Sequence, residues 1–412
     1  MISPLHSDLA YLDDKREEMT EILRDWCAIN SGSRNLEGLG KMRSRICDAF
    51  SSVADEIETV AADPHQVVDD AGDVQEVQVG DMVRIVHNAQ APVRVLLSGH
   101  MDTVFPVDHA FQSDTYLDDD TLNAPGGADM KGGLLVMLYA LKTIARSKWA
   151  DQIGYEVLIN ADEEIGSHGS ARAIHAAAER AQFACVYEPA LADGTLAGAR
   201  KGSGNFTAVF KGKSAHAGRE HHLGRNAIVA AADFAVSISK LTGGRENLTV
   251  NVGKIDGGGP VNVVPGLAMT AFNVRIEQPG DADWLYENAQ ERLNDIARDH
   301  DVAGELVGGF TRPPKPMTPQ LQKFFEALRS VGAEIGIGVN WKPTGGCCDG
   351  NNIAAAGIPV IDTLGVRGGS IHSADEYVRL DSLVERAKLS ALLLLKIASG
   401  ELPNPGTVGV GK

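Results

Sequence analysis

The chain alternates short apolar runs with segments that carry apolar residues at helical spacing. Helices are expected over 8–30, 36–54, 133–147 and 168–180. The runs APVRVLLS, GYEVLIN and FACVYEP are short, apolar and rich in β-branched residues, which is typical of buried strands. Because strands and helices alternate, the pattern predicts an α/β fold with a mainly parallel sheet and helices on both faces.

The order of elements changes in the middle of the chain. Between about Ser203 and Arg312 it becomes strand, helix, strand, strand, helix, strand, the order of a self-contained, ferredoxin-like α+β domain. ARKGSG and TRPPKPMTP flank this segment and are typical of hinges. Residues 203–314 are therefore predicted to be a domain inserted into a larger one, which 1–202 and 315–412 form. The expected strands of the inserted domain are 205–213, 247–255, 267–277 and 303–310, and its expected helices are 225–241 and 282–299.

The rest of the larger domain follows the α/β pattern. IETVA, VQEVQVG and DMVRIVHN are expected to be strands, and the Asp-rich segment 107–128 is expected to be a polar loop. After the inserted domain we expect helices over 318–333, 350–356 and 380–399, with strands GVNWKP and PVIDTLG between them.

Composition narrows the function classes. The formal net charge of -17 argues against nucleic acid or an anionic membrane as a partner. No apolar run is long enough to span a bilayer, and the N-terminus lacks the basic and apolar regions of a signal peptide. The five cysteines include no CxxC pair, so reduced thiols in a cytoplasmic protein are expected.

Acidic and histidine side chains recur where apolar runs end. Because the carboxyl ends of parallel strands meet at one edge of the sheet, these side chains are expected to converge. Each position alone also fits a surface residue or a turn, and only the repeated placement favours a site. The positions are His100 and Asp102 in SGHMD, Asp129 in GGADMKGG, Glu163 and Glu164 in DEEIGS, Glu188 in VYEP, and His372 in SIHSADEY.

This set of side chains suits a divalent metal site. Two histidines and three carboxylates are ligands that zinc prefers. Two neighbouring dications repel, so a carboxylate shared between them is expected. An additional acid beside the metals is the natural general base. The glycine-rich GGADMKGG has neither the Walker A spacing nor a dinucleotide fingerprint. Its glycines are therefore expected to let the backbone wrap around a metal-binding Asp.

In sequence order, SGHMDTVFP, GGADMKGG, DEEIGS, YEP and IHSADEY resemble the zinc-dependent M20 peptidase family, most closely its glutamate carboxypeptidases of the carboxypeptidase G2 type. The resemblance covers nearly the whole chain. It implies that His100 and Glu188 hold one zinc, that Glu164 and His372 hold the other, and that Asp129 bridges them. Co2+ or Mn2+ are alternative metals.

The same resemblance implies the remaining catalytic roles. Glu163 acts as general base and acid, and Asp102 orients His100 through the other ring nitrogen. The peptide bond after Asp129 is expected to be cis. The inserted domain is expected to be a lid and dimerisation domain, so the chain is expected to be a homodimer. In the family, the residue matching His216 reaches the partner's site and stabilises the oxyanion.

Substrate-binding residues are also carried over. The residues that match Asn262 and Arg275 hold the carboxylate side of the substrate in the family, and arginine suits a planar carboxylate. Gly346 lies in the segment that matches the glycine-rich substrate loop, where Cys347 and Cys348 depart from the commoner small or hydroxyl residues; a packing role is expected for them. Arg367 is a second candidate for binding an anionic group.

The predicted function is hydrolysis of an amide bond next to a free carboxylate, in a peptide or a small molecule, most closely as a glutamate carboxypeptidase. An N-acyl amino acid deacylase, of the acetylornithine deacetylase or succinyl-diaminopimelate desuccinylase type, uses the same chemistry and is the alternative. An aminopeptidase or dipeptidase would need an acid for a free α-amine, and the sequence offers no dedicated candidate. A non-catalytic binding relative would lack a ligand or the base, whereas every such position is present.

Overall fold

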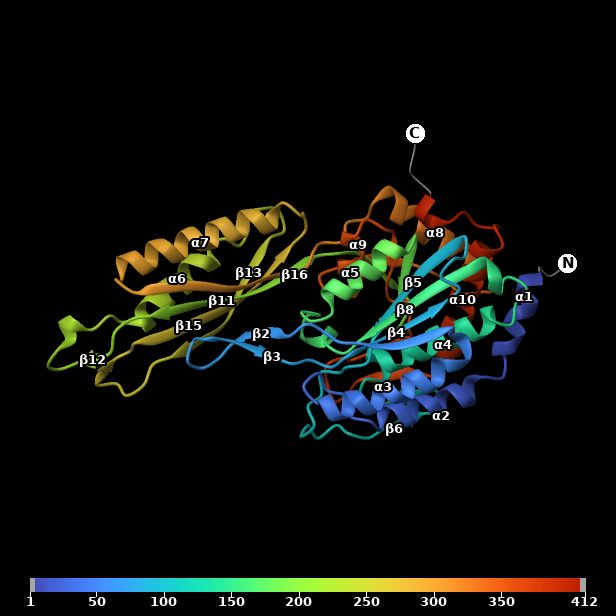
Figure 1. The fold of residues 1–412 in the computed structure, drawn as a ribbon, viewed down its shortest axis with the longest axis horizontal. Helices are drawn as coiled ribbons and strands as arrows, with labels where there is room; N and C mark the ends of the chain where they lie inside the picture. The colour runs from blue at the N-terminus through green and yellow to red at the C-terminus, as the bar shows by residue number, and fades with distance from the viewer. Residues whose placement is uncertain (1–3, 408–412) are drawn as a thin grey trace.

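The computed structural model describes residues 4–407 and shows two bodies joined end to end (Figure 1). The larger body contains the first and the last parts of the chain, and the smaller body contains the middle of the sequence. The chain thus leaves the larger body, builds the smaller one and returns. No helix in the described part of the chain has both the length and the apolar character that a membrane span requires.

A six-stranded sheet lies at the centre of the larger body. In spatial order its strands are β1 (Glu56–Val60), β4 (Met82–His87), β8 (Ile153–Asn160), β5 (Val93–His100), β9 (Phe183–Val186) and β18 (Val360–Ile361). The last four run parallel to one another, whereas β4 is antiparallel to β8 and β1 is antiparallel to β4. The predicted mainly parallel sheet is confirmed.

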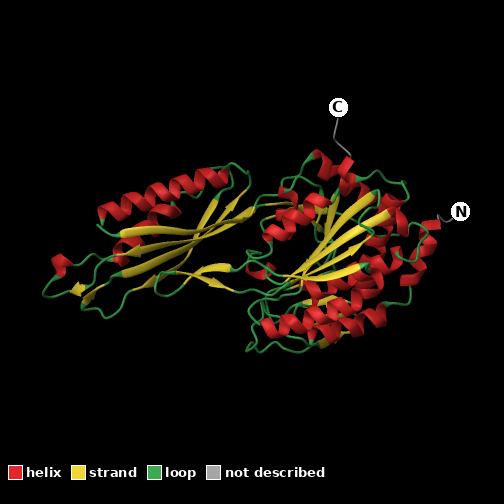
Figure 2. Cartoon of the chain, in the orientation of Figure 1, coloured by secondary structure: helices red, strands yellow, loops and turns green. Residues whose placement is uncertain are grey.

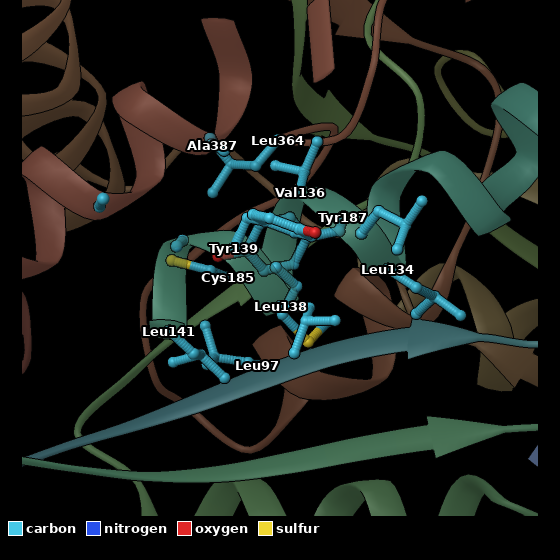
Figure 3. Close-up of a cluster of buried hydrophobic side chains, with 14 of the residues drawn as sticks. Leu97, Leu134, Val136, Leu138, Tyr139, Leu141, Cys185, Tyr187, Leu364 and Ala387 are labelled. Carbon is cyan, nitrogen blue, oxygen red and sulfur yellow. The ribbon is translucent and has the colours of Figure 1, made fainter. Parts of the chain in front are cut away.

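Helices cover both faces of this sheet, as predicted (Figure 2). Neighbouring residues of β5 point to opposite faces: Leu97 joins the larger core, and Leu96 joins a smaller core with Ile174. Figure 3 shows Leu97 beneath side chains of the helix that follows Asp129. That helix is apolar on nearly all sides, as a fully buried helix must be. The larger core takes in α2 (Arg16–Cys27), α3 (Leu36–Phe50), α4 (Gly132–Ile144), α8 (Pro319–Glu334) and α10 (Asp381–Ala398), and the smaller core takes in α5 (Ala171–Arg180) and α9 (Asp349–Ala355).

The smaller body is a four-stranded antiparallel sheet with two helices on one face. In spatial order its strands are β13 (Thr249–Gly257), β15 (Leu267–Ile276), β11 (Gly202–Lys211) and β16 (Ala303–Arg312). The helices are α6 (Ala227–Ser239) and α7 (Asp281–Asp299), which pack on Phe206, Phe210 and Phe272. The chain order is β11-α6-β13-β15-α7-β16, the order that the sequence predicts. The short strands β12 (Ala215–His216) and β14 (Val263–Val264) pair at the end far from the larger body (Figure 1).

A hairpin that the sequence did not predict connects the two bodies. It consists of β2 (His65–Val68) and β3 (Val74–Val77), and it leaves the central sheet to lie against the smaller body (Figure 1). The sequence predicted a single strand in this region. The Asp69 carboxylate closes the turn by accepting hydrogen bonds from the backbone of Ala71 and Asp73, each at 2.9 Å.

Three other segments differ from the prediction. The expected loop 107–128 contains β6 (Thr115–Asp118) and β7 (Thr121–Asn123), which join β19 (Gly368–Gly369) and β20 (Tyr377–Arg379) in a second sheet. Strands this short leave little periodicity to read. In place of the helix expected over 8–30, α1 (Pro4–Asp8) ends at Asp8, a 3-10 turn spans Leu9–Leu12, and α2 begins only at Arg16. β17 (Trp341–Thr344) pairs with β10 (Leu196–Arg200) outside the central sheet.

Candidate metal centre and active site

The strand ends of the central sheet gather the predicted site residues. His100 is the last residue of β5, Glu163 and Glu164 follow β8, and Glu188 follows β9. These strands are parallel neighbours, so their carboxyl ends lie at one edge. Asp129, just before α4, and His372, in the loop between β19 and β20, complete the cluster.

Asp129 lies between the two histidines. His100 Nε2 is 3.2 Å from Asp129 Oδ1 and 3.7 Å from Glu188 Oε2. His372 Nε2 is 3.3 Å from Asp129 Oδ2 and 3.2 Å from Glu164 Oε2. Each oxygen of Asp129 therefore faces a different pair of side chains, the arrangement expected of a carboxylate shared by two ions.

The spacing of these atoms fits metal ligation. Zinc holds nitrogen and oxygen ligands at about 2.1 Å, and tetrahedral ligands at that distance lie about 3.4 Å apart. The distances between histidine nitrogens and carboxylate oxygens, 3.2 to 3.7 Å, lie around this value. Ligand atoms of His100, Asp129 and Glu164 lie within 4.8 Å of one another, as do those of His100, Glu163 and Glu188. The donor set thus fits one or two divalent cations.

Buried acids give this cluster an unusual electrostatic character. Burial raises the pKa of Glu163 well above its usual range, against the opposing effect of Arg312. Burial and the neighbouring Asp129 raise the pKa of Glu164 to about 8. Hydrogen bonds to Asp129 and Glu164 raise the pKa of His372 to about 10. A dication bound among these acids would favour their charged forms and so lower the pKa of both glutamates.

The Asp102 carboxylate connects the two sides of the site. Its Oδ1 lies 3.4 Å from His100 Nδ1, and the Asp102 backbone carbonyl is 3.0 Å from the same nitrogen. The carboxylate also accepts hydrogen bonds from the backbone N–H groups of Glu163 at 3.2 Å and Glu164 at 3.1 Å, and from the Ser33 hydroxyl at 2.7 Å. Asp102 is fully buried. It therefore fixes both the ring of His100 and the backbone of the two glutamates.

Arg312 is a site residue that the sequence analysis missed. It is the last residue of β16, and its Nη2 lies 2.6 Å from Glu163 Oε1. Its Nη1 pairs with the Asp349 carboxylate and donates to Asn352 Oδ1 at 3.1 Å. TRPPKPMTP is expected to be a hinge, and the arginine near the start of that hinge was the available signal in the sequence. Arg312 links the smaller body directly to Glu163.

Glu376 is a second residue that was missed. Its carboxylate accepts hydrogen bonds from the backbone N–H groups of Gly126 at 3.0 Å, Ala128 at 2.9 Å and Asp129 at 3.0 Å. A buried carboxylate with three backbone donors fixes the glycine-rich loop and hence Asp129. Its nearness to His372 in SIHSADEY was the only signal in the sequence. The peptide bond between Asp129 and Met130 is cis, as the family resemblance implied.

Two cavities meet at the cluster. A cavity of about 860 Å³ runs between the smaller body and the hairpin β2–β3, and Arg275, Gly346 and Cys347 line it together with Glu163 and His372. A second cavity of about 500 Å³ lies on the other side, against Leu191, Thr195 and Ile371. Gly346 and Cys347 border both, so the loop that the resemblance singled out does lie at the site.

The adjacent cysteines have different surroundings. The Cys347 thiol donates to the Lys201 carbonyl at 2.9 Å and accepts from Arg275 Nη1 at 3.0 Å. Cys348 is buried and caps the first turn of α9, accepting from the Gly350 N–H at 3.3 Å. Cys348 thus has the expected packing role, whereas Cys347 lies in the cavity wall beside Arg275.

Three predicted residues lie away from the cluster of their own chain. His216 and Asn262 lie together at the far end of the smaller body, where the Ala217 N–H donates to the Asn262 carbonyl at 2.9 Å. Asn262 is therefore at the opposite end of the smaller body from Arg275, and the prediction that both hold the carboxylate side of the substrate stays a prediction. Arg367 Nη2 lies 2.8 Å from Asp381 and 3.2 Å from Glu385, so its guanidinium is already paired and does not line either cavity.

Comparison with known proteins agrees with this geometry. The profile of Peptidase family M20/M25/M40 matches residues 96–396. The chain belongs to peptidase family M20. It is 30% identical to carboxypeptidase G2 of Pseudomonas sp. (strain RS-16) over 328 residues, which is 78% of each chain. It is also 30% identical to the succinyl-diaminopimelate desuccinylase of Pseudoalteromonas translucida (strain TAC 125) over 284 residues, 65% of this chain and 73% of that enzyme.

Solved structures share the fold. The di-peptidase Dug1p of Saccharomyces cerevisiae superposes with a TM-score of 0.73 at 14% identity, covering 98% of this chain and 100% of that one. Family M20 consists of metal-dependent peptidases and related hydrolases, so this M20 protein is a hydrolase, and the cluster around Asp129 is its candidate metal site.

Proposed function

We propose that this M20 hydrolase cleaves an amide bond next to a free carboxylate, using a pair of zinc ions. His100 and Glu188 would hold one ion, His372 and Glu164 the other, and Asp129 both. The observation that supports this most strongly is that the two oxygens of Asp129 face the two histidines at 3.2 and 3.3 Å. When bound, zinc acts as a Lewis acid that polarises a carbonyl group and acidifies water.

The chain's own residues divide the remaining work. Glu163 is the spare acid beside the ligands, and its role is to take a proton from water and return it to the leaving amine. Arg312, 2.6 Å from Glu163, holds that carboxylate in a fixed position. Asp102 sets the orientation of His100 and of the backbone at Glu163.

The released part of the substrate is proposed to be an amino acid with a free carboxylate, most closely glutamate. Arg275 lies in the cavity wall, where a guanidinium can bind a carboxylate through two parallel hydrogen bonds. A substrate can approach the backbone of Gly346 closely, because the glycine has no side chain and the space beside its Cα is nearly open. The similarity to carboxypeptidase G2 supports the same substrate class.

A deacylase that removes a small acyl group from an amino acid is the second candidate, because the chain is also 30% identical to a succinyl-diaminopimelate desuccinylase, over a shorter stretch than to carboxypeptidase G2. The test is a panel of acyl-glutamate, acyl-aspartate and neutral acyl-amino acid amides, with acetylornithine and succinyl-diaminopimelate, each with zinc or cobalt present. Release of glutamate from peptidyl or aroyl substrates supports the carboxypeptidase. Turnover of only acetylornithine and succinyl-diaminopimelate contradicts the carboxypeptidase assignment.

We also propose a homodimer in which residues 203–314 form the lid and the dimer contact. His216 and Asn262 lie too far out to reach their own cluster, and a partner would bring them to it. Helix α6 carries Ile228, Val229 and Val236 on an exposed face, and apolar patches of this kind mark protein interfaces. The free thiols of all five cysteines fit a cytoplasmic enzyme.

Mixing two impaired variants tests the dimer. His216→Ala and Glu163→Gln should each turn over substrate far more slowly than the wild-type enzyme, because each removes one part of every site. In a mixed dimer, the chain that keeps Glu163 receives His216 from its partner, so activity should return. Activity that does not rise after the subunits have demonstrably exchanged contradicts the shared site.

A further inference from the structure

The larger cavity extends well beyond the metal cluster. It begins at Glu163, Glu164 and His372 and continues between the smaller body's sheet and strand β2. Helices α6 and α7 cover one face of that sheet, so the cavity lies on the other face. A substrate with only a small acyl group would leave most of this space unused.

Three asparagines lie side by side on this face of the sheet. Asn205 of β11 is paired in register with Asn273 of β15, and Asn273 with Asn251 of β13. All three line the cavity. Asn273 Nδ2 donates to Asn205 Oδ1 at 2.8 Å, and Asn273 Oδ1 accepts from Arg275 Nε at 3.1 Å. Asn273 thus ties the row to Arg275 and engages the side-chain carbonyl oxygen of Asn205. The Nδ2 group of Asn205 and the amide of Asn251, both on exposed residues, remain available to a ligand.

The opposite wall is the edge of a strand. Among the described residues, β2 has β3 as its strand partner on one side, and the cavity lies against β2, whose residues 65–68 line it. Unpaired N–H and C=O groups at such an edge are a template for a further strand.

Both walls are held in place. Lys211 Nζ of the smaller body lies 2.6 Å from Asp73 Oδ1 in the hairpin turn. At the base of the hairpin, the His65 ring packs edge-on against His168, with 4.0 Å between ring centroids. Gly72 packs so closely on Leu267 and Val209 that a side chain there would clash. The space between the walls therefore does not depend on the ligand.

We propose that this cavity binds the acyl side of the substrate as an extended peptide, which pairs with the edge of β2 and is hydrogen-bonded by Asn205 and Asn251. Asparagine both donates and accepts, which matches the alternating groups of a peptide backbone. Along β15, Arg275, which is proposed to hold the terminal carboxylate, and Ala271 both line the cavity and are four residues apart. That separation is about 13 Å, or roughly four extended residues, and it has to hold the released amino acid as well as the acyl residues. This rests on the proposed function and specifies its substrates as peptides of several residues that end in a free carboxylate.

The test uses zinc-loaded enzyme and a series with one leaving group: acetyl-Glu, acetyl-Ala-Glu and acetyl-Ala-Ala-Ala-Glu. We expect kcat/KM to rise about tenfold or more along the series, the factor that one net hydrogen bond provides. The ratio between the longest and the shortest substrate should fall toward one in Asn205→Ala and Asn251→Ala. Replacing the internal alanines by sarcosine, which removes the N–H donors, should have the same effect on that ratio.

Asn294→Ala is the matched control, because Asn294 is exposed on α7, on the covered side of the sheet. In Asn294→Ala, the ratio of kcat/KM between the longest and the shortest substrate should equal that of the wild-type enzyme. A flat length dependence, or an equal change in Asn294→Ala, overturns the proposal. If no glutamyl substrate is cleaved, the proposed function fails instead. The peptide site is then tested by measuring the Kd of the same peptides for the zinc-loaded Glu163→Gln enzyme. A Kd that falls as the peptide lengthens supports binding of an extended peptide in the cavity, and a Kd independent of length contradicts it.

Discussion

Glu163→Gln is expected to lower kcat by about 10²- to 10⁴-fold, the contribution typical of a general acid–base residue. The change keeps the size and shape of the side chain but removes its ability to take a proton. Metal content should stay at the wild-type level, because the proposed ligands are His100, Asp129, Glu164, Glu188 and His372. Steady-state kinetics together with elemental analysis measure both quantities on one preparation.

The neighbouring residue provides the matched control. Glu164 Oε2 faces His372 at 3.2 Å, so Glu164→Gln should lower the metal content as well as the activity. If Glu163→Gln retains wild-type turnover, or loses metal as Glu164→Gln does, the assignment of the base is wrong.

Arg312→Ala is expected to lower the free energy of unfolding by about 3–5 kcal/mol, the cost of removing one partner from a buried ion pair. The Arg312 side chain is 5% exposed and pairs with the carboxylates of Glu163, whose side chain is 10% exposed, and of Asp349, which is buried. Without the guanidinium, the two carboxylates lose their common cation. The kcat should fall in addition, because Glu163 loses the group that fixes it. Urea unfolding and kinetics on the same variant measure the two effects.

Arg298→Ala controls for the loss of an arginine from the smaller body. Arg298 is 70% exposed and pairs with Asp295 on the surface of α7, where an ion pair is worth about 1 kcal/mol or less. Arg312→Lys keeps the charge without the planar fork and should fall between Arg312→Ala and the wild-type protein. Equal losses in Arg312→Ala and Arg298→Ala would contradict the role given to Arg312.

Local pattern was sufficient to predict the architecture. The alternation of apolar strands with helices specified the mainly parallel sheet, and the change of order after Ser203 specified the second domain's element order. His100, Glu164 and Glu188 could be predicted because each lies at or just after the carboxyl end of a strand, and these strand ends lie at the same edge. Their convergence is a consequence of parallel pairing.

Features that depend on distant partners could not be predicted. Arg312 and Glu376 matter because of Glu163 and the loop before α4, which are far away in the sequence. Arg367 was predicted from its nearness to His372, but Asp381 and Glu385 at the start of α10 bind its guanidinium. The hairpin β2–β3 contacts the other body through Asp73 and Gly72, and short polar strands do not reveal such distant partners.

The most direct measurement is the metal content of the purified protein after exhaustive dialysis, compared with that of Asp129→Ala. A carboxylate shared by two ions predicts about two zinc ions per chain in the wild-type protein and loss of both in the variant. Protein that binds no divalent metal, or that keeps its full content without Asp129, would contradict a metal pair at the end of the central sheet.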